Sequence, residues 1–240
     1  MAKETGEWIM YGLEWDDPLR IRSWQELINW INEIGFLPLF KNEIEGFSVE
    51  EHTFGPFWWS GDPAEDPWIW REIIARSGEV AYGKFFGKKS GFVSLSWFPA
   101  FANYRRDDYD FDARWDDELA GIRSKKIMDC FADGGEFMGV QLKKTAGFGK
   151  GKEKNFDGVI ADLQMQTYLT IKDFRRKVNK RGGEYGMPVC IYSRPEDVWG
   201  YEMVSSCYRE DPEECRRRIY EQVRNNFSST TEKQLERVLR

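Results

Sequence analysis

Apolar residues recur near the N-terminus at the spacing of one helical face. Leu27, Ile28 and Ile31 follow a capping-box sequence that runs from Ser23 to Glu26. Gly35 comes soon after this periodic run and is a typical helix stop. The pattern therefore predicts a first helix that begins after Ser23 and ends before Gly35.

Two more helix starts and a hairpin are predicted in the first hundred residues. A second capping box at residues 48–51 begins a short helix, and an Asp-Pro pair at 66–67 begins a third helix that runs to Gly78. Two β-prone runs, 79–86 and 91–95, follow and are joined by the turn-like sequence GKKS. Three helices followed by a hairpin is the order of a winged helix.

The same order of elements is predicted again downstream. A helical stretch covers 119–131, a short helix follows near 142–146, and Asn155 is the expected cap of a third helix with an apolar face. Two β-prone runs, 168–174 and 187–192, then flank the turn-like sequence NKRGGEYG. They predict a second hairpin that is longer and more basic than the first.

Corresponding elements of the two halves begin at a nearly constant separation. The third helices begin at Pro67 and Phe156, and the hairpins begin at Val80 and Tyr168. This regularity predicts an α+β fold made of tandem winged-helix units, each a helix-turn-helix with a β-hairpin wing, followed by a C-terminal helical segment. The expected divisions are a first winged-helix-like unit, an ordered connector, a second winged-helix unit with a basic wing and the C-terminal segment, at residues 1–100, 101–117, 118–193 and 194–240.

The connector and the C-terminal segment are both expected to be ordered. Residues 101–117 are dense in aromatic and carboxylate side chains and lack the Gly and Pro spacing of a flexible linker. Their carboxylates either bind a cation or neutralise the arginines beside them, Arg105, Arg106 and Arg114. Beyond Arg194 the pattern is helical again, with helix starts at 211–212 and 229–232.

Positive charge is concentrated in one part of an acidic chain. The whole sequence has 35 Lys and Arg against 41 Asp and Glu, but residues 141–186 contain eleven Lys and Arg against five Asp and Glu. These cations flank the third helix of the second unit and follow its wing, where such residues contact phosphate in DNA-binding proteins. An ordinary solvated face is the alternative. The candidate contacts to double-stranded DNA are Lys143, Lys144, Lys150, Lys152, Lys154, Lys172, Arg175, Arg176, Lys177, Lys180 and Arg181.

Composition limits the class of protein and its location. Hydrophobic residues make up 41% of the chain and charged residues 32%, as in soluble globular proteins. The sequence has neither an apolar run of about 20 residues nor a secretory signal, so we expect a cytoplasmic protein without membrane association. Four cysteines without a CxxC pair and a single histidine, His52, give no expectation of a metal site.

Two glutamines lie where the third helix of the second unit is expected to become a strand. If this helix ends near Leu163, Gln164 and Gln166 project to one side of an extended stretch while Met165 projects to the other. Two amides can hold a water molecule by donating and accepting hydrogen bonds. A positioned water suffices to hydrolyse the N-glycosidic bond of an alkylated base, because that base leaves readily. A helix cap or a groove contact is the alternative role.

With these features the chain resembles the AlkZ (YcaQ-like) family of winged-helix DNA glycosylases. It resembles more closely a shorter AlkZ-related group of bacterial proteins that carry stretches like AYGKFF, WFPAFANYRR and LQMQTYL. The resemblance implies winged helices that form a concave DNA-binding surface and an activity in DNA repair, the excision of alkylated purines. It also implies a QxQ element that places the catalytic water without a metal or other cofactor, and this element falls on Gln164 and Gln166.

Three functions remain open at this point. The chain is a DNA glycosylase, a DNA-binding or regulatory protein without catalytic activity, or a module that binds another protein through its acidic faces. The first two predict DNA binding that weakens with salt, and only the first predicts release of a base. The third predicts little affinity for DNA at any salt concentration.

Overall fold

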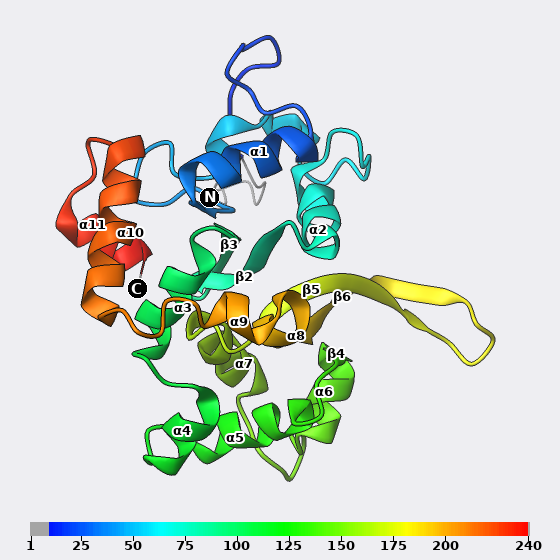
Figure 1. Ribbon diagram of the computed structural model, residues 1–240. Coiled ribbons are helices and arrows are strands. Elements are labelled where there is room, and N and C mark those ends of the chain that lie inside the picture. Colours follow the sequence, from blue (N-terminus) through cyan, green and yellow to red (C-terminus); the bar gives the residue numbers. More distant parts are fainter. Residues whose placement is uncertain (1–9, 240) are drawn as a thin grey trace.

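Two small antiparallel sheets organise this mixed α+β protein, and the computed structural model describes residues 10–239 (Figure 1). The first sheet contains β1 (Phe36–Pro38), β2 (Val80–Phe86) and β3 (Lys89–Ser94). The second sheet contains β4 (Glu136–Met138), β5 (Thr170–Val178) and β6 (Glu184–Ser193). The strand orders are β1-β3-β2 and β4-β6-β5, so the same connectivity occurs twice.

The helices that precede the first hairpin are α1 (Trp24–Ile34), the 3-10 helices η1 (Glu50–His52) and η2 (Gly55–Phe57), and α2 (Pro67–Ser77). Of these, α1 and α2 begin directly after their predicted caps. Ser23 Oγ accepts a hydrogen bond from the backbone N–H of the third residue of α1 (3.2 Å), and Asp66 accepts one from the second residue of α2 (2.8 Å). The predicted helices α1 and α2 are thus confirmed, whereas the short helix predicted between them is the 3-10 helix η1.

The second sheet is preceded by helices in the same order. They are α5 (Ile122–Met128), the 3-10 helix η3 (Asp129–Phe131), α6 (Gly139–Thr145) and α7 (Phe156–Met165). The helix expected from residue 119 begins later, at Ile122, and ends as η3. Asn155 occupies the N-cap position of α7 but makes no side-chain capping hydrogen bond, and α7 continues through Met165, two residues beyond Leu163.

The segment between the two sheets forms two helices that the periodicity did not predict. They are α3 (Phe98–Arg106) and α4 (Phe111–Asp116). Seven of the nine residues of α3 are buried, including Asn103 and Arg106, so the helix lacks the polar face on which an amphipathic pattern depends. The connector, residues 101–117, was expected to be ordered and packed; its first part is the buried end of α3, whereas α4 buries only Phe111.

The C-terminal segment packs against the first half of the chain. It contains α8 (Pro195–Trp199), α9 (Tyr201–Val204), α10 (Pro212–Asn226) and α11 (Glu232–Val238). Asn103 Nδ2 of α3 donates to the carbonyl of Glu210 (2.9 Å), and Gln222 Nε2 donates to that of Ile34 (3.2 Å). The last helix begins two residues later than expected, because Thr231 and not Ser229 caps it.

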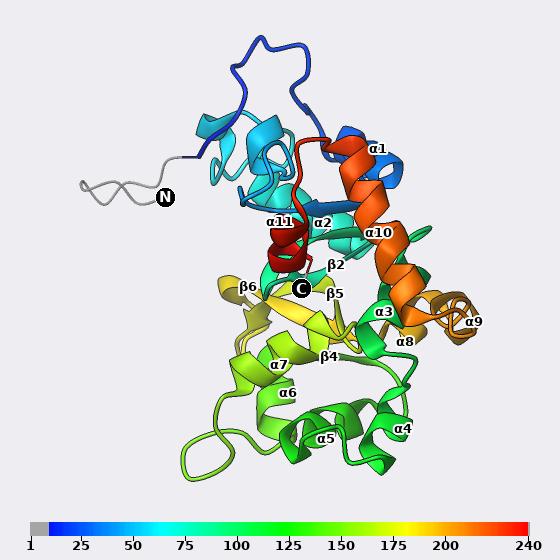
Figure 2. The same cartoon turned by 90° about the vertical axis from the view of Figure 1, so that its left-hand side faces the viewer.

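Side chains from both sheets belong to one hydrophobic cluster. The sheets meet at β2 and β5, where Thr170 Oγ1 donates to the carbonyl of Tyr82 (2.9 Å) and the ring centroids of Tyr82 and Phe174 lie 6.0 Å apart. Figures 1 and 2 place α1 at one end of the molecule and α4 and α5 at the other. No helix within residues 10–239 has the length and the apolar character needed to cross a membrane.

Candidate nucleic-acid interface

The outer part of the β5–β6 hairpin extends beyond the region where β4 pairs with it, and it projects away from the body of the protein (Figure 1). Its turn is well ordered by Asn179, whose N–H donates to the carbonyl of Gly183 (2.9 Å) and whose Oδ1 accepts from the N–H of Arg181 (2.8 Å). Gly182 adopts a positive φ of 82° in this turn, as glycine does without strain. The hairpin therefore presents its tip as a defined structure.

Four cations of the hairpin lie outside the ion pairs at its base. No carboxylate within residues 10–239 lies within ion-pair distance of Arg176, Lys177, Lys180 or Arg181. An anion from outside the protein can therefore approach them without displacing an internal ion pair.

The cations at the base of the hairpin are engaged within the protein. Glu136 lies 2.9 Å from Lys172 Nζ and 2.6 Å from Arg175 Nη1, and Arg175 Nε also donates to Asp173 (2.8 Å). Hydrogen bonds from Lys172 and Arg175 lower the pKa of Glu136 below its ordinary value. These two cations connect β5 with β4 across the intervening strand β6, and they are less available to a partner than the tip residues.

The remaining sequence candidates lie on α6 and on the loop that follows it. All five are exposed, and none has an ion-pair partner among residues 10–239: Lys143, Lys144, Lys150, Lys152 and Lys154. The acid of this loop, Glu153, is held by Lys126 Nζ (2.7 Å) and Arg123 Nε (3.1 Å), which tie the loop to α5. The eleven predicted cations are thus divided between the hairpin and a separate loop.

In a winged helix the third helix enters the DNA groove, but α7 presents acid instead of base. Its exposed residues are Asp157 and Asp162, and Asp162 pairs with Lys88 (2.6 Å). Most of its other side chains are buried, and the helix contains no Lys or Arg. Contacts to a polyanion are therefore better placed on the hairpin and the loop than on α7.

Gln164 and Gln166 do not share a direction, and the expectation that they do is wrong. Because α7 continues through Met165, Gln164 lies within the helix and Gln166 is its C-cap residue. Gln164 is fully buried; its Oε1 accepts from the backbone N–H of Lys84 (3.0 Å) and its Nε2 donates to the carbonyl of Ile160 (3.0 Å). Gln166 is half-buried.

A pocket of about 490 Å³ lies beside the chain that follows Gln166, and the sequence did not indicate it. Its lining includes Arg106, Asp110, Tyr168 and Glu196, which come from α3, the connector, the start of β5 and α8. Because residues so far apart in the sequence form it, no local pattern could have revealed it. Phe111 and Met128 also line the pocket, so its surface combines charged and hydroxyl groups with apolar side chains.

Arg106 is the central side chain of this pocket and is almost fully buried. It donates to the carbonyl of Thr167 (2.7 Å), to Glu196 (2.5 Å) and to the hydroxyl of Tyr208 (2.5 Å). Burial alone would lower the pKa of Arg106, but Glu196 and Tyr208 together outweigh burial and raise that pKa above its ordinary value. Arg106 is therefore a fixed, paired charge.

The connector carboxylates neutralise the neighbouring arginines only in part. Asp110 lies 3.9 Å from Arg106 and accepts hydrogen bonds from Tyr201 (2.9 Å) and Tyr208 (3.0 Å). Arg105 pairs with no carboxylate among residues 10–239; it donates to backbone carbonyls, and burial lowers its pKa to about 10. No group of three or more acidic, histidine or cysteine side chains within that range is arranged to hold a metal ion.

Comparison with known proteins gives one match. A family model described as AlkZ related matches residues 21–240, which is nearly the whole chain. The comparisons with curated proteins and with solved structures returned no match.

Proposed function

Because the chain belongs to the AlkZ-related family, we propose that it binds double-stranded DNA and that the β5–β6 hairpin is its main contact. In this proposal each sheet with its preceding helices is a winged helix, and the hairpin is the wing of the second unit. The repeated order of helix, strand, helix, helix, strand and strand supports this interpretation. The second unit spans residues 118–193 and carries the contacts.

The observation that carries the proposal is the set of unpaired cations on the projecting hairpin, Arg176, Lys177, Lys180 and Arg181. Each cation that reaches a phosphate releases condensed counterions, which is the main source of affinity for duplex DNA. A two-stranded ribbon also has the width that the major groove of B-DNA accepts. Lys143, Lys144 and the lysines of the 147–155 loop add a second, separate group of phosphate contacts.

The acidic remainder of the chain supports one orientation on DNA. The net charge of the whole chain is −6, whereas residues 141–186 have an excess of positive charge. The rest of the surface is therefore strongly negative and is repelled by the duplex. This distribution of charge favours an approach with the hairpin and the 147–155 loop toward DNA.

Excision of an alkylated base is the second candidate function, and membership in the AlkZ-related family favours it. In this version Gln166 orients the attacking water, because its half-buried side chain makes no hydrogen bond to residues 10–239. Gln164 serves the fold, since both ends of its amide are bonded within the protein. The pocket beside Arg106 lies next to this element and is large enough for a base.

The test of DNA binding compares two variants with the same change in charge. One replaces Lys177, Lys180 and Arg181 with alanine, and the control replaces the exposed residues Lys89, Arg209 and Lys233. Affinity for a short duplex is measured at about 50 mM and about 200 mM salt, and we expect the slope of log K against log salt to fall by about 0.9 for each phosphate that the variant no longer neutralises. The control should keep the slope of the native chain.

The outcomes separate the functions that were open from the sequence. Equal slopes for both variants would contradict the hairpin as the contact, and no binding at the lower salt concentration would favour a protein-interaction module. A duplex with an alkylated purine then tests catalysis. If the native chain releases the base and Gln166→Ala does not, excision is supported. If the native chain releases no base, the function that remains is DNA binding without catalysis.

A further inference from the structure

A loop near the N-terminus, residues 13–21, is closed at its base like an Ω-loop. The N–H of Leu13 donates to the carbonyl of Thr53 (3.1 Å), and the N–H of Ile21 donates to that of His52 (2.8 Å). Gly12 permits this close approach, because a Cβ there would lie 2.0 Å from the Thr53 carbonyl oxygen. The two ends of the loop are therefore held together.

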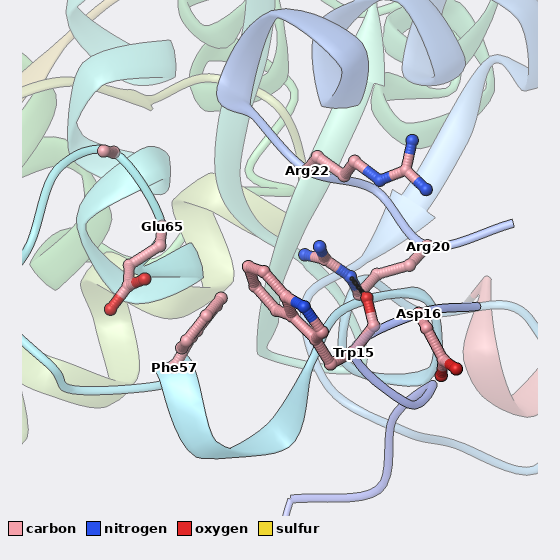
Figure 3. A pocket seen from close by; sticks show the side chains of 7 residues that line it. Trp15, Asp16, Arg20, Arg22, Phe57 and Glu65 are labelled. Atoms are coloured by element: carbon pink, nitrogen blue, oxygen red, sulfur yellow. Dashed lines mark hydrogen bonds between the residues drawn. The ribbon is translucent and has the colours of Figure 1, made fainter. Parts of the chain in front are cut away.

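A pocket of about 510 Å³ opens between this loop and η2 (Figure 3). Its walls include Trp15, Arg20 and Arg22 from the loop and the segment after it, and Phe57 from η2. The volume falls within the range of small-molecule sites. Trp15 is 57% exposed although it is one of the largest apolar side chains, so much of its surface is available to a ligand.

Arg20 is the side chain that indicates which ligand fits. It is only 7% exposed, its Nε donates to the carbonyl of Trp15 (3.0 Å), and its guanidinium carbon lies 4.4 Å from the centroid of the Trp15 ring. Its two Nη atoms make no hydrogen bond or ion pair with any residue from 10 to 239. The Arg20 guanidinium has no carboxylate partner among residues 10–239, and its free Nη edge is suited to a bidentate oxyanion.

A second cation and two aromatic rings also line this pocket. Arg22 is exposed, and its side chain has no ion-pair partner among residues 10–239. Figure 3 shows the guanidinium of Arg20 against the Trp15 ring on the side where Arg22 also lies, with Phe57 next to Trp15. The pocket thus combines two cations with the faces of aromatic rings.

From this arrangement we propose that the pocket binds a nucleotide. The phosphate contacts Arg20 and Arg22, and the base stacks on Trp15. Stacking of the base on Trp15 should make a nucleotide bind more tightly than inorganic phosphate, which has no base. Asp16 and Glu65, at opposite edges of the pocket in Figure 3, accept hydrogen bonds from amino or hydroxyl groups of the ligand. The nucleotide is either free or one unit of a strand.

Calorimetric titration of the full chain tests this site with three probes: inorganic phosphate, deoxyadenosine monophosphate and the 5′-phosphorylated dinucleotide of deoxyadenosine. We expect the mononucleotide to bind at least tenfold more tightly than phosphate. Tighter binding of the dinucleotide identifies a strand as the source, and tighter binding of the mononucleotide identifies a free nucleotide. Both results support the site.

Variants at exposed positions complete the test without disturbing the core. Trp15→Ala and Arg22→Ala should each weaken the mononucleotide at least tenfold, Trp15→Phe should retain most of the affinity, and Lys233→Ala should change nothing. The proposal is overturned if the native chain binds no mononucleotide at millimolar concentration, or binds it no better than phosphate. It is also overturned if Trp15→Ala and Arg22→Ala bind as the native chain does.

Discussion

At the scale of single residues, Gln164 explains why a polar side chain is found in the core. The pairing of β2 with β3 shifts register between Gly83 and Phe86, so the N–H of Lys84 falls in an irregularity of the ladder. Gln164 Oε1 accepts from this N–H and connects α7 with β2 (3.0 Å). The amide replaces a backbone acceptor that the bulge does not provide.

Substitution of Gln164 with methionine should lower the free energy of unfolding by about 1–3 kcal/mol, because the N–H of Lys84 loses its acceptor while the side-chain volume is nearly preserved. Urea unfolding at neutral pH measures this change. Gln166→Met is the control, and it should change the free energy by no more than about 0.5 kcal/mol. An equal cost at both positions would contradict the structural role of Gln164.

The direction of these two glutamines could not be predicted from the sequence. The apolar face of α7 ends at Leu163, so periodicity alone places the end of the helix there. The helical backbone nevertheless continues for two more residues, through Met165. In contrast, the concentration of cations on the hairpin was readable from residue type and turn signals. The nucleotide pocket depends on the unpaired edge of Arg20, which only the three-dimensional arrangement reveals.

At the scale of elements, Asp173 connects α2 of the first half with the hairpin of the second. Its carboxylate accepts from Arg76 Nε (2.8 Å), from Arg175 Nε (2.8 Å) and from the N–H of Phe174 (2.7 Å). Burial alone would raise the pKa of Asp173, but these hydrogen bonds outweigh burial and hold it below the ordinary value of 3.8. The charged form is therefore the one that stabilises the fold.

The pH dependence of stability should report this connection. A carboxylate with a lowered pKa stabilises the folded protein above its ordinary value of 3.8, and the contribution is lost as the pH falls through the lower folded value. Asp173→Asn should therefore be less stable than the native chain at pH 7, and the difference should begin to shrink only below about pH 4 and close as the pH falls through the lower folded pKa. Denaturant midpoints across this range measure the difference, and a constant difference would exclude the proposed linkage.

Strong local signals made some elements predictable and left others hidden. Caps such as Ser23 and Asp66 specify their helices because the hydrogen-bonding side chain lies within three residues of its partner. The three-residue strands β1 and β4 were not predicted from the sequence, because so short a run has no recognisable period and forms a strand only by pairing with a distant one. Helix α3 was not predicted either, because it is buried on nearly all sides and so shows no amphipathic pattern.

At the scale of the whole molecule, Arg106 joins three parts of the chain. It extends from α3, and its guanidinium meets Thr167 before β5, Glu196 in α8 and Tyr208 after α9. The Glu196 contact links residues that are 90 positions apart. Arg106 therefore helps to fix the C-terminal segment, together with the contacts of Asn103 and Gln222.

Replacement of Arg106 with methionine should cost about 3–5 kcal/mol, because the partners of a buried charge are left without it. Thermal unfolding measures the loss as a decrease in Tm. Arg217→Met removes an exposed arginine that pairs with Glu214 and Glu221 on α10, and it should have a much smaller effect. A comparable decrease in Tm for the two variants would show that Arg106 does not hold the parts together.

The projecting hairpin has one further consequence, which concerns solubility. Strand β4 pairs with β6 only at residues 191–193, so farther out both edges of the β5–β6 ribbon carry unpaired backbone groups. Val178, Tyr185 and Met187 are exposed on the same ribbon. Strand edges with unpaired backbone groups and apolar side chains favour pairing between two copies of the protein. The positive charges of the hairpin tip oppose this pairing, because they repel those of the other copy. Neutralising the tip should therefore promote self-association, visible by size-exclusion chromatography.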